Sequence, residues 1–260
     1  MERPLTKFIE WLLSLVEDEK DRPTKEDLIV KEEDVSSDKP VQHYSSIFDS
    51  NLEFYKVSEI KKLHTPYKFK YNKNYAFIVH YTSGSSSWSA KDFFSWMLKE
   101  RLCTYYIDGE GLLWCNHDQD RCGWHTGKDL KDKYSKFRHK CAGVEIASPG
   151  KVKPIKYDST GSPIEFKSWF GEKYTKDQVV YVSALESDYL HTGYYVPFTK
   201  AQEKTLARLI IWHRNKGLPL ENVLGHDDIC YPHGRKVDPC GSLSLPLKEF
   251  INKYCITLGV

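Results

Sequence analysis

Apolar and polar positions divide the chain into a polar first fifth and a longer part with the texture of a folded domain. Residues 5–17 carry apolar side chains at helical spacing, which predicts a short amphipathic helix. Residues 17–40 hold ten acidic and five basic residues, with Pro23 and Pro40 as breakers, and predict a solvated linker or a loosely held arm. We therefore expect residues 1–50 to form an N-terminal helix and acidic linker or arm, and residues 51–260 to form one domain.

Apolar runs predict a sheet in the second part. Residues 75–79 read Tyr-Ala-Phe-Ile-Val between polar neighbours, as a buried central strand does. Further strands are expected at 103–107, 111–115, 143–147 and 223–224. The Asp-Gly-Glu-Gly sequence at 108–111 favours a hairpin turn between the first two of these.

Helices are predicted between the strands. One is expected over 89–100 and another begins at Thr199, where Gln202 three residues later completes the capping-box pattern; Gly217 and Pro219 end it. A last helix is expected at 246–256. Residues 148–175 are rich in Pro, Gly, Lys and Tyr and are interpreted as a long surface excursion. Strands interleaved with helices predict an α/β layer fold with a central sheet.

Composition narrows the classes of function. The 38 basic and 36 acidic residues leave a net charge of +2, which argues against nucleic acid as the main partner. No stretch approaches the roughly 18 apolar residues that cross a bilayer. The apolar run at 8–16 is interrupted by Glu10 and lacks a small-residue cleavage pattern, so we expect synthesis in the cytoplasm. The seven cysteines are mostly expected as buried thiols, with Cys115–Cys122 and Cys230–Cys240 as possible pairs.

Three groups are candidates for a metal site. His80 ends the predicted buried strand, at the sheet edge where open α/β folds build their sites. His226 follows the strand at 223–224, and Asp238 comes twelve residues later. Two imidazoles and a carboxylate form the ligand set of catalytic zinc sites. Each residue also has a purely structural interpretation. His80 would be a hydrogen-bonded histidine at a strand end, His226 a salt-linked loop residue, and Asp238 part of a turn before proline.

Four segments resemble one family. They are Phe-Ile-Val-His-Tyr-Thr-Ser-Gly at 77–84, Trp-His-Thr-Gly at 124–127, Gly-Val-Glu-Ile at 143–146, and the stretch from Leu224 to Gly241 that contains Gly-His-Asp-Asp-Ile and Gly-Arg-Lys-Val-Asp-Pro. In this order they resemble the zinc-dependent N-acetylmuramoyl-L-alanine amidases, which include muropeptide-recycling amidases, phage lysozyme-type amidases and peptidoglycan recognition proteins. The likeness covers roughly residues 70–255 and implies a central mixed β-sheet flanked by helices, with the N-terminal helical extension added.

The resemblance also implies roles for single residues. The metal ligands would be His80, His226 and Asp238, the acid/base carboxylate Glu145, the oxyanion-stabilising cation Lys236, and the substrate-binding residues Thr82, Trp124 and His125. By the same resemblance, the cofactor of this protein would be Zn²⁺, and residues 51–260 would be the zinc amidase domain.

The chain also departs from the family. The loop between His226 and Lys236 is about two residues longer than the family's pattern, so His233 competes as a metal ligand. Cys240 is a second rival to Asp238, because thiolate suits zinc. Cys103 stands where some relatives carry a tyrosine.

The resemblance implies an enzyme that cleaves the amide between the lactyl group of N-acetylmuramic acid and L-alanine, either as a phage endolysin or as a cytoplasmic recycling amidase. A phage endolysin would be released to the wall by another protein. The alternatives are a peptidoglycan- or muropeptide-binding module of the same fold without catalysis, and an adaptor that acts through its acidic arm. The partner would be peptidoglycan or a muropeptide, and we expect a monomer.

Overall fold

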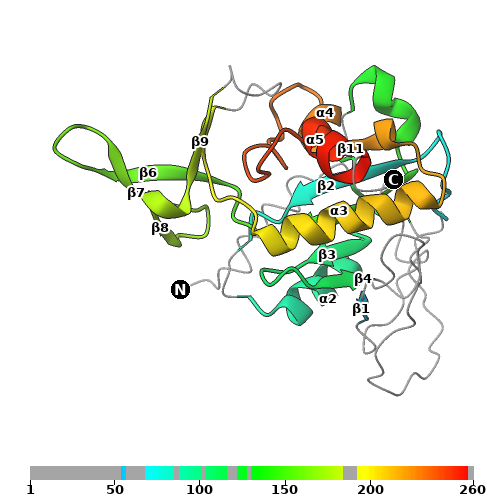
Figure 1. Cartoon of the computed structure of the whole chain (residues 1–260), viewed down its shortest axis with the longest axis horizontal. Coiled ribbons are helices and arrows are strands. Elements are labelled where there is room, and N and C mark those ends of the chain that lie inside the picture. Colours follow the sequence, from blue (N-terminus) through cyan, green and yellow to red (C-terminus); the bar gives the residue numbers. More distant parts are fainter. Residues whose placement is uncertain are drawn as a thin grey trace.

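A six-stranded mixed sheet forms the centre of the molecule (Figure 1). The structure is a computed structural model and describes residues 54–56, 68–84, 88–100, 103–115, 122–127, 130–183 and 192–256. The strands of this sheet are β1 (Phe54–Lys56), β2 (Ala76–Tyr81), β3 (Tyr105–Ile107), β4 (Leu113–Cys115), β5 (Cys141–Ile146) and β11 (Val223–Gly225). Their order is β1-β4-β3-β5-β2-β11, and the expected α/β fold with a central mixed sheet is confirmed.

The middle of the sheet is parallel. β3, β5, β2 and β11 run in one direction, whereas β4 is antiparallel to β3 through the predicted hairpin and β1 pairs parallel to β4. Parallel strands bring their carboxyl ends to one edge, where α/β folds place ligands. In this register Glu145 of β5 stands between His80 of β2 and Tyr106 of β3, so the three side chains share one face.

Helices cover both faces of the sheet. Those of the described residues are α2 (Ala90–Lys99), α3 (Lys200–Asn215), α4 (His226–Ile229), α5 (Leu247–Phe250), the π-helix η6 (Ile251–Ile256), and the 3-10 turns η3 (Asp132–Phe137), η4 (Lys176–Gln178) and η5 (Leu220–Asn222). α3, α5 and η6 pack on one face of the sheet, where they bury Val79, Tyr105 and Val144 of the strands. On the other face α2 packs over β3 and β4, while η3 and α4 pack near the start of β2.

The ends of α3 confirm the local signals in the sequence. The Thr199 hydroxyl accepts a hydrogen bond from Gln202 N, and the Gln202 side-chain oxygen accepts one from Thr199 N, which completes the capping box. After the helix, Gly217 takes φ +101°, a conformation that glycine adopts without strain. The Gln202 amide also donates to the carbonyls of Asp108 and Ala147, so α3 is fixed to the ends of β3 and β5.

A second sheet replaces the expected surface excursion at 148–175. Its strands are β6 (Lys151–Tyr157), β7 (Pro163–Lys167), β8 (Lys173–Thr175), β9 (Val180–Val182) and β10 (Gly193–Tyr195), in the order β8-β7-β6-β10-β9. The prediction was wrong because β6 to β9 are mostly exposed, with Val152 and Phe166 their buried apolar residues. Pro154 and two register shifts in β6 further break the alternation of apolar and polar residues that marks a half-buried strand.

Other expectations have separate outcomes. The helix predicted at 5–17 and the acidic segment at 17–40 lie outside the described residues. All seven cysteines are in the described part of the chain, each as a buried thiol rather than half of a disulfide, so neither suggested pair is bridged. Among the helices described, none has the length and apolar character that crossing a membrane requires.

Candidate active site

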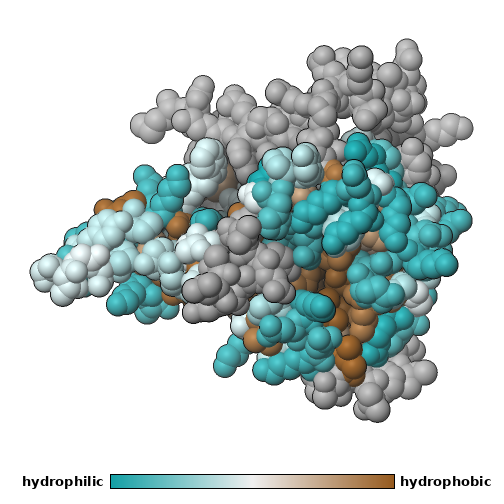
Figure 2. Space-filling model, turned by 90° about the horizontal axis from the view of Figure 1, so that it is seen from above, coloured by the Kyte–Doolittle hydropathy of each residue, from teal (hydrophilic) through white to brown (hydrophobic). Residues whose placement is uncertain are grey.

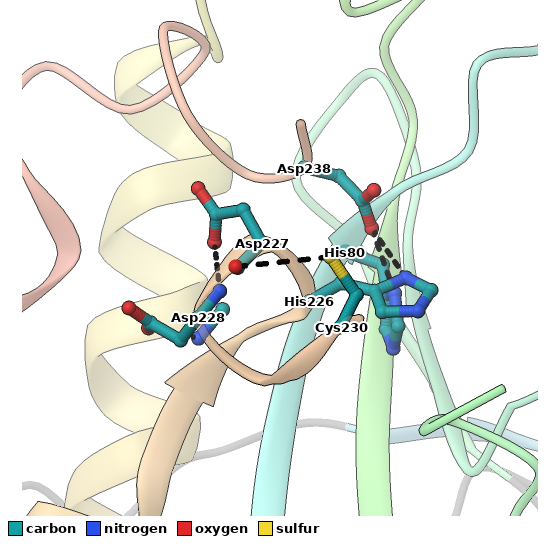
Figure 3. A network of polar contacts seen from close by, with 7 residues as sticks. His80, His226, Asp227, Asp228, Cys230 and Asp238 are labelled. Carbon is teal, nitrogen blue, oxygen red and sulfur yellow. Dashed lines mark hydrogen bonds and ion pairs between the residues drawn. The ribbon is translucent and has the colours of Figure 1, made fainter. Parts of the chain in front are cut away.

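Two histidines and an aspartate meet at the edge of the central sheet. His80 lies near the end of β2, His226 begins α4 directly after β11, and Asp238 comes from the loop that follows (Figure 3). Asp238 Oδ2 lies 2.8 Å from His80 Nδ1 and 3.1 Å from His226 Nδ1. One candidate ligand atom from each of the three residues lies within 4.8 Å of the other two.

The local chain path fixes this cluster. β11 pairs with β2 so that Gly225 stands beside Val79, and the residue that follows each of these two along the chain is one of the two histidines. Asp227 N donates to the Asp238 carbonyl at 3.0 Å, which holds the two ends of the 226–238 segment together. The Asp228 carboxylate accepts a hydrogen bond from Gly225 N at the start of the short helix α4. The backbone thus sets the position of the three side chains.

The cluster fits a divalent metal ion. All three side chains are buried, and the Nδ1 atoms of His80 and His226 both point at Asp238 Oδ2. Ligand atoms about 2.0–2.1 Å from a tetrahedral zinc stand about 3.3 Å apart. The Asp238 oxygen lies 2.8 and 3.1 Å from the two Nδ1 atoms, and the three candidate ligand atoms lie within 4.8 Å of one another. The donor set of two imidazoles and one carboxylate suits zinc.

The charge states favour binding of a cation. Burial alone would raise the pKa of Asp238, but His226 and His80 outweigh it and hold that pKa well below its usual range. Burial lowers the pKa of His226 to about 4, against the opposing effect of Asp238. An ionised carboxylate beside a neutral imidazole is the protonation state in which these groups bind a metal.

Glu145 and Lys236 lie next to the cluster. Glu145 is half-buried and directly opposite His80 in the sheet register. Burial and the Asp238 carboxylate raise its pKa well above the usual range, while the Lys236 ammonium opposes this. Lys236 is half-buried; burial and Arg235 lower its pKa, against the opposing effects of Asp238 and Glu145. A carboxyl group and an ammonium group therefore interact with each other and with Asp238.

The three residues expected at the substrate occupy different environments. His125 is 1% exposed and stacks on the His80 ring at 5.2 Å. Burial and the nearby His80 and His226 lower its pKa well below the usual range. A Cβ at Gly143 would come within 2.6 Å of His125 Nδ1, so the ring requires glycine there. His125 thus packs on His80, one of the three residues of the cluster.

Thr82 and Trp124 lie nearer the edge of the site. The Thr82 hydroxyl is buried, donates to the Ser148 carbonyl at 3.2 Å and accepts from Gly84 N at 3.1 Å. It joins the ends of β2 and β5. Trp124 is half-buried and meets the ring of His139 edge-on at 5.4 Å.

The rival ligands do not join the cluster. The three-residue group contains Asp238 but neither His233 nor Cys240. His233 is exposed, and its Nδ1 lies 3.2 Å from Lys131 Nζ. Lys131 also donates to the Asp228 carbonyl, so the longer loop is fixed to the segment before η3.

A small pocket adjoins the site and was not predicted from the sequence. Its volume is about 130 Å³, and its lining includes Thr82, Trp88, Phe93, Tyr106 and Ser148. Tyr106 shares a sheet face with Glu145. The residues come from the ends of β2, β3 and β5 and from the start of α2, and their spacing in sequence carries no signal of this juxtaposition.

Comparison with solved structures gives amidases of low identity. AmiD from E. coli, in complex with the substrate anhydro-N-acetylmuramic acid-L-Ala-D-gamma-Glu-L-Lys, is 18% identical with a TM-score of 0.40, over 69% of this chain and 56% of that chain. AmpDh3 from Pseudomonas aeruginosa with anhydromuramic pentapeptide is 20% identical with a TM-score of 0.39, over 72% and 61%. LysC from Clostridium intestinale URNW is 15% identical with a TM-score of 0.40, over 77% and 95%. This chain thus spans little more than half of the AmiD chain.

The comparison of sequences decides the family. No curated protein matches the chain. The family model described as N-acetylmuramoyl-L-alanine amidase matches residues 71–241, well over half of the 260 residues. The matched range contains the whole His80–His226–Asp238 cluster together with Glu145 and Lys236. The chain therefore belongs to the N-acetylmuramoyl-L-alanine amidase family, the class of enzymes that its sequence motifs resemble.

Proposed function

We propose that this protein is a zinc-dependent peptidoglycan hydrolase that cleaves the amide between the lactyl group of N-acetylmuramic acid and L-alanine. The observation that carries the proposal is the buried His80–His226–Asp238 cluster beside Glu145 and Lys236, in a chain of the amidase family. A binding module without catalysis has no need of all these groups together.

The first step of the proposal concerns the metal. His80, His226 and Asp238 would hold the ion, and His125 keeps the His80 ring in place by stacking on it. When bound, zinc supplies Lewis acidity, which polarises a carbonyl group and lowers the pKa of water towards about 7.

The second step concerns proton transfer and charge. Glu145 accepts a proton from the attacking water as the new carbon–oxygen bond forms, and delivers it to the amide nitrogen as the carbon–nitrogen bond breaks. The products are a lactyl carboxylic acid and a free amine on L-alanine, so atoms and charge balance. Lys236 directs its ammonium group at the developing oxyanion, a contribution that is stronger in the transition state than in the bound substrate.

We infer that the substrate is polymeric wall, as for an endolysin, rather than a soluble fragment from recycling. The loop at 226–236, which the sequence indicates to be longer than the family's pattern, and the projecting second sheet (Figure 1) support this, because a polymer offers parts that reach surfaces away from the cluster. Hydrolysis of intact sacculi, compared with that of small anhydro-muropeptides, tests the inference. A protein active on fragments alone would be a recycling amidase.

The test of the proposed function joins metal content to amide hydrolysis. Elemental analysis of the protein should find one zinc ion per chain, and sacculi should release L-alanine amino groups. Zinc at 100 times its Kd should stabilise the fold by about 2.7 kcal/mol. His80→Ala and Asp238→Ala should lose the bound zinc, the stabilisation and the hydrolysis, whereas His233→Ala, the matched control in the longer loop, should keep all three.

Two results would contradict the proposal. Full hydrolysis by protein stripped of metal would remove zinc from the reaction. Zinc binding and sacculus binding without any release of amino groups would instead identify the non-catalytic module.

A further inference from the structure

The second sheet carries a row of lysines that the proposed chemistry does not use. Lys153 of β6 stands directly opposite Lys167 of β7, and Lys167 stands directly opposite Lys173 of β8. Directly opposed residues of antiparallel strands project from the same face, and neighbouring strands are about 4.8 Å apart. All three side chains are exposed. We call these three residues the lysine row.

Electrostatic repulsion within the lysine row lowers the stability of the isolated protein. Like charges directly opposite each other destabilise a sheet. The face also carries Lys151 and Lys156. Its one acidic residue among the described strands, Glu165, already binds Lys173 Nζ at 2.9 Å. Five lysines against one carboxylate leave this face strongly positive. A surface of this kind complements a ligand with repeated negative charges.

One turn links the lysine row to the pocket beside the candidate active site. Lys167 and Lys173 flank the turn at 168–172, which carries Trp169 with 64% of its surface exposed. The next residue, Phe170, packs edge-on against Trp88 at 5.0 Å. Trp88 lines the 130 Å³ pocket that also contains Thr82, two residues beyond His80.

The second sheet projects from the body of the molecule, as Figures 1 and 2 show. Its visible surface in Figure 2 is largely hydrophilic, with a few hydrophobic residues between. A projecting, positively charged sheet joined to the site by an aromatic turn is suited to contact parts of a large substrate that lie far from the scissile bond.

We propose that the lysine row and Trp169 bind the peptidoglycan polymer outside the catalytic centre, with the lysines pairing with carboxylates of the stem peptides and the indole packing on the glycan. The inference rests on the proposed function, because that function supplies the polymer. Stem peptides carry carboxylates, and a cluster of ammonium groups complements their charge. Trp169 adds a large, rigid apolar surface of the kind that dominates binding energy.

The test separates binding of polymer from hydrolysis of a fragment. The variant Lys153→Gln/Lys167→Gln removes two charges of the row and leaves the Lys173–Glu165 ion pair intact. The matched control, Lys200→Gln/Lys204→Gln, makes the same change of charge at exposed positions of α3. Binding is measured by co-sedimentation with purified sacculi from which phosphate-containing polymers have been extracted. Hydrolysis is measured on a soluble muropeptide.

We expect the lysine-row variant to bind sacculi about tenfold more weakly than the control at low salt, and the difference to shrink as salt is raised. Trp169→Ala should weaken binding as well, without the dependence on salt. Hydrolysis of the soluble muropeptide should be unchanged in each variant. The melting temperature of the lysine-row variant should be equal or higher, because a repulsion has been removed.

Three results would overturn the inference. The first is equal binding of the lysine-row variant and the control to extracted sacculi. The second is binding of the unaltered protein that disappears when phosphate polymers are extracted, which would make those polymers the ligand. The third is an equal loss of fragment hydrolysis and sacculus binding at an unchanged melting temperature, which would show that the lysines act at the catalytic centre and not outside it. If the unaltered protein binds sacculi but releases amino groups from neither sacculi nor fragments, the proposed function fails while the binding comparison still decides the role of the lysine row.

Discussion

Replacement of His213 by leucine tests how a buried imidazole couples the stability of this fold to pH. His213 lies on α3, has no exposed surface, and neither ring nitrogen has a hydrogen-bond partner among the described residues. Its ring packs 4.4 Å from that of Phe77, and the titratable or charged groups around it are Tyr71, Tyr105 and Lys216. Burial first, and the Lys216 charge second, lower the pKa of His213 well below its usual range.

The magnitude follows from proton linkage. The unfolded chain binds a proton at this histidine with a pKa of about 6.5, whereas the folded chain keeps the ring neutral. Above that pH neither state is protonated, so the stability is unaffected. Below it the unfolded state alone gains the proton, and the free energy of unfolding falls by up to about 1.4 kcal/mol per pH unit. Between pH 7.5 and 5.5, protonation of His213 in the unfolded chain therefore lowers the free energy of unfolding by about 1.4 kcal/mol. For a domain of this size, this corresponds to a fall of about 3–6 °C in melting temperature.

Urea denaturation at both pH values measures this effect. Leucine is close to histidine in size and favours helix, so His213→Leu should fold. Between pH 7.5 and 5.5 its free energy of unfolding should fall by about 1.4 kcal/mol less than that of the unaltered protein. Ile210→Val, a buried change on the same helix, should cost roughly 0.5–1.5 kcal/mol at both pH values and leave the difference between them unaltered. If the protein and His213→Leu lose equal stability on acidification, the imidazole is protonated in the fold and the reasoning is wrong.

Three further predictions concern the site and its support. Glu145→Gln should lower kcat about 10²- to 10⁴-fold while elemental analysis still finds zinc, and an undiminished kcat would exclude Glu145 as the acid/base group. Lys236→Met should lower kcat about 10²- to 10³-fold with KM nearly unchanged; a rise in KM alone would assign Lys236 to substrate binding. Gln202→Leu leaves the buried carbonyls of Asp108 and Ala147 without their shared donor, and should cost about 2–4 kcal/mol in urea denaturation; a loss below 1 kcal/mol would show that water replaces the amide.

Local signals in the sequence determined many of the elements. The capping box at Thr199 and Gln202 and the glycine at 217 set the ends of α3, because the groups that satisfy a helix end lie within a few residues of it. The apolar run at 75–79 predicted β2, and the turn sequence at 108–111 predicted the β3–β4 hairpin. The motifs also named His80, His226 and Asp238 as one set, on the strength of a resemblance and not of their spacing.

Tertiary structure alone decided how these residues meet. His80 and Asp238 are 158 positions apart in the chain, and their 2.8 Å contact exists only because β11 pairs with β2 and the 226–238 segment folds back across the edge of the sheet. The lysine row likewise arises from the register of three strands, and the sequence shows only scattered lysines. Strands as exposed as β6 to β8 lack the alternation that burial imposes, so only their hydrogen-bonded pairing reveals them. Local chemistry fixes where an element begins and ends, but distances between elements depend on packing and pairing over the whole chain.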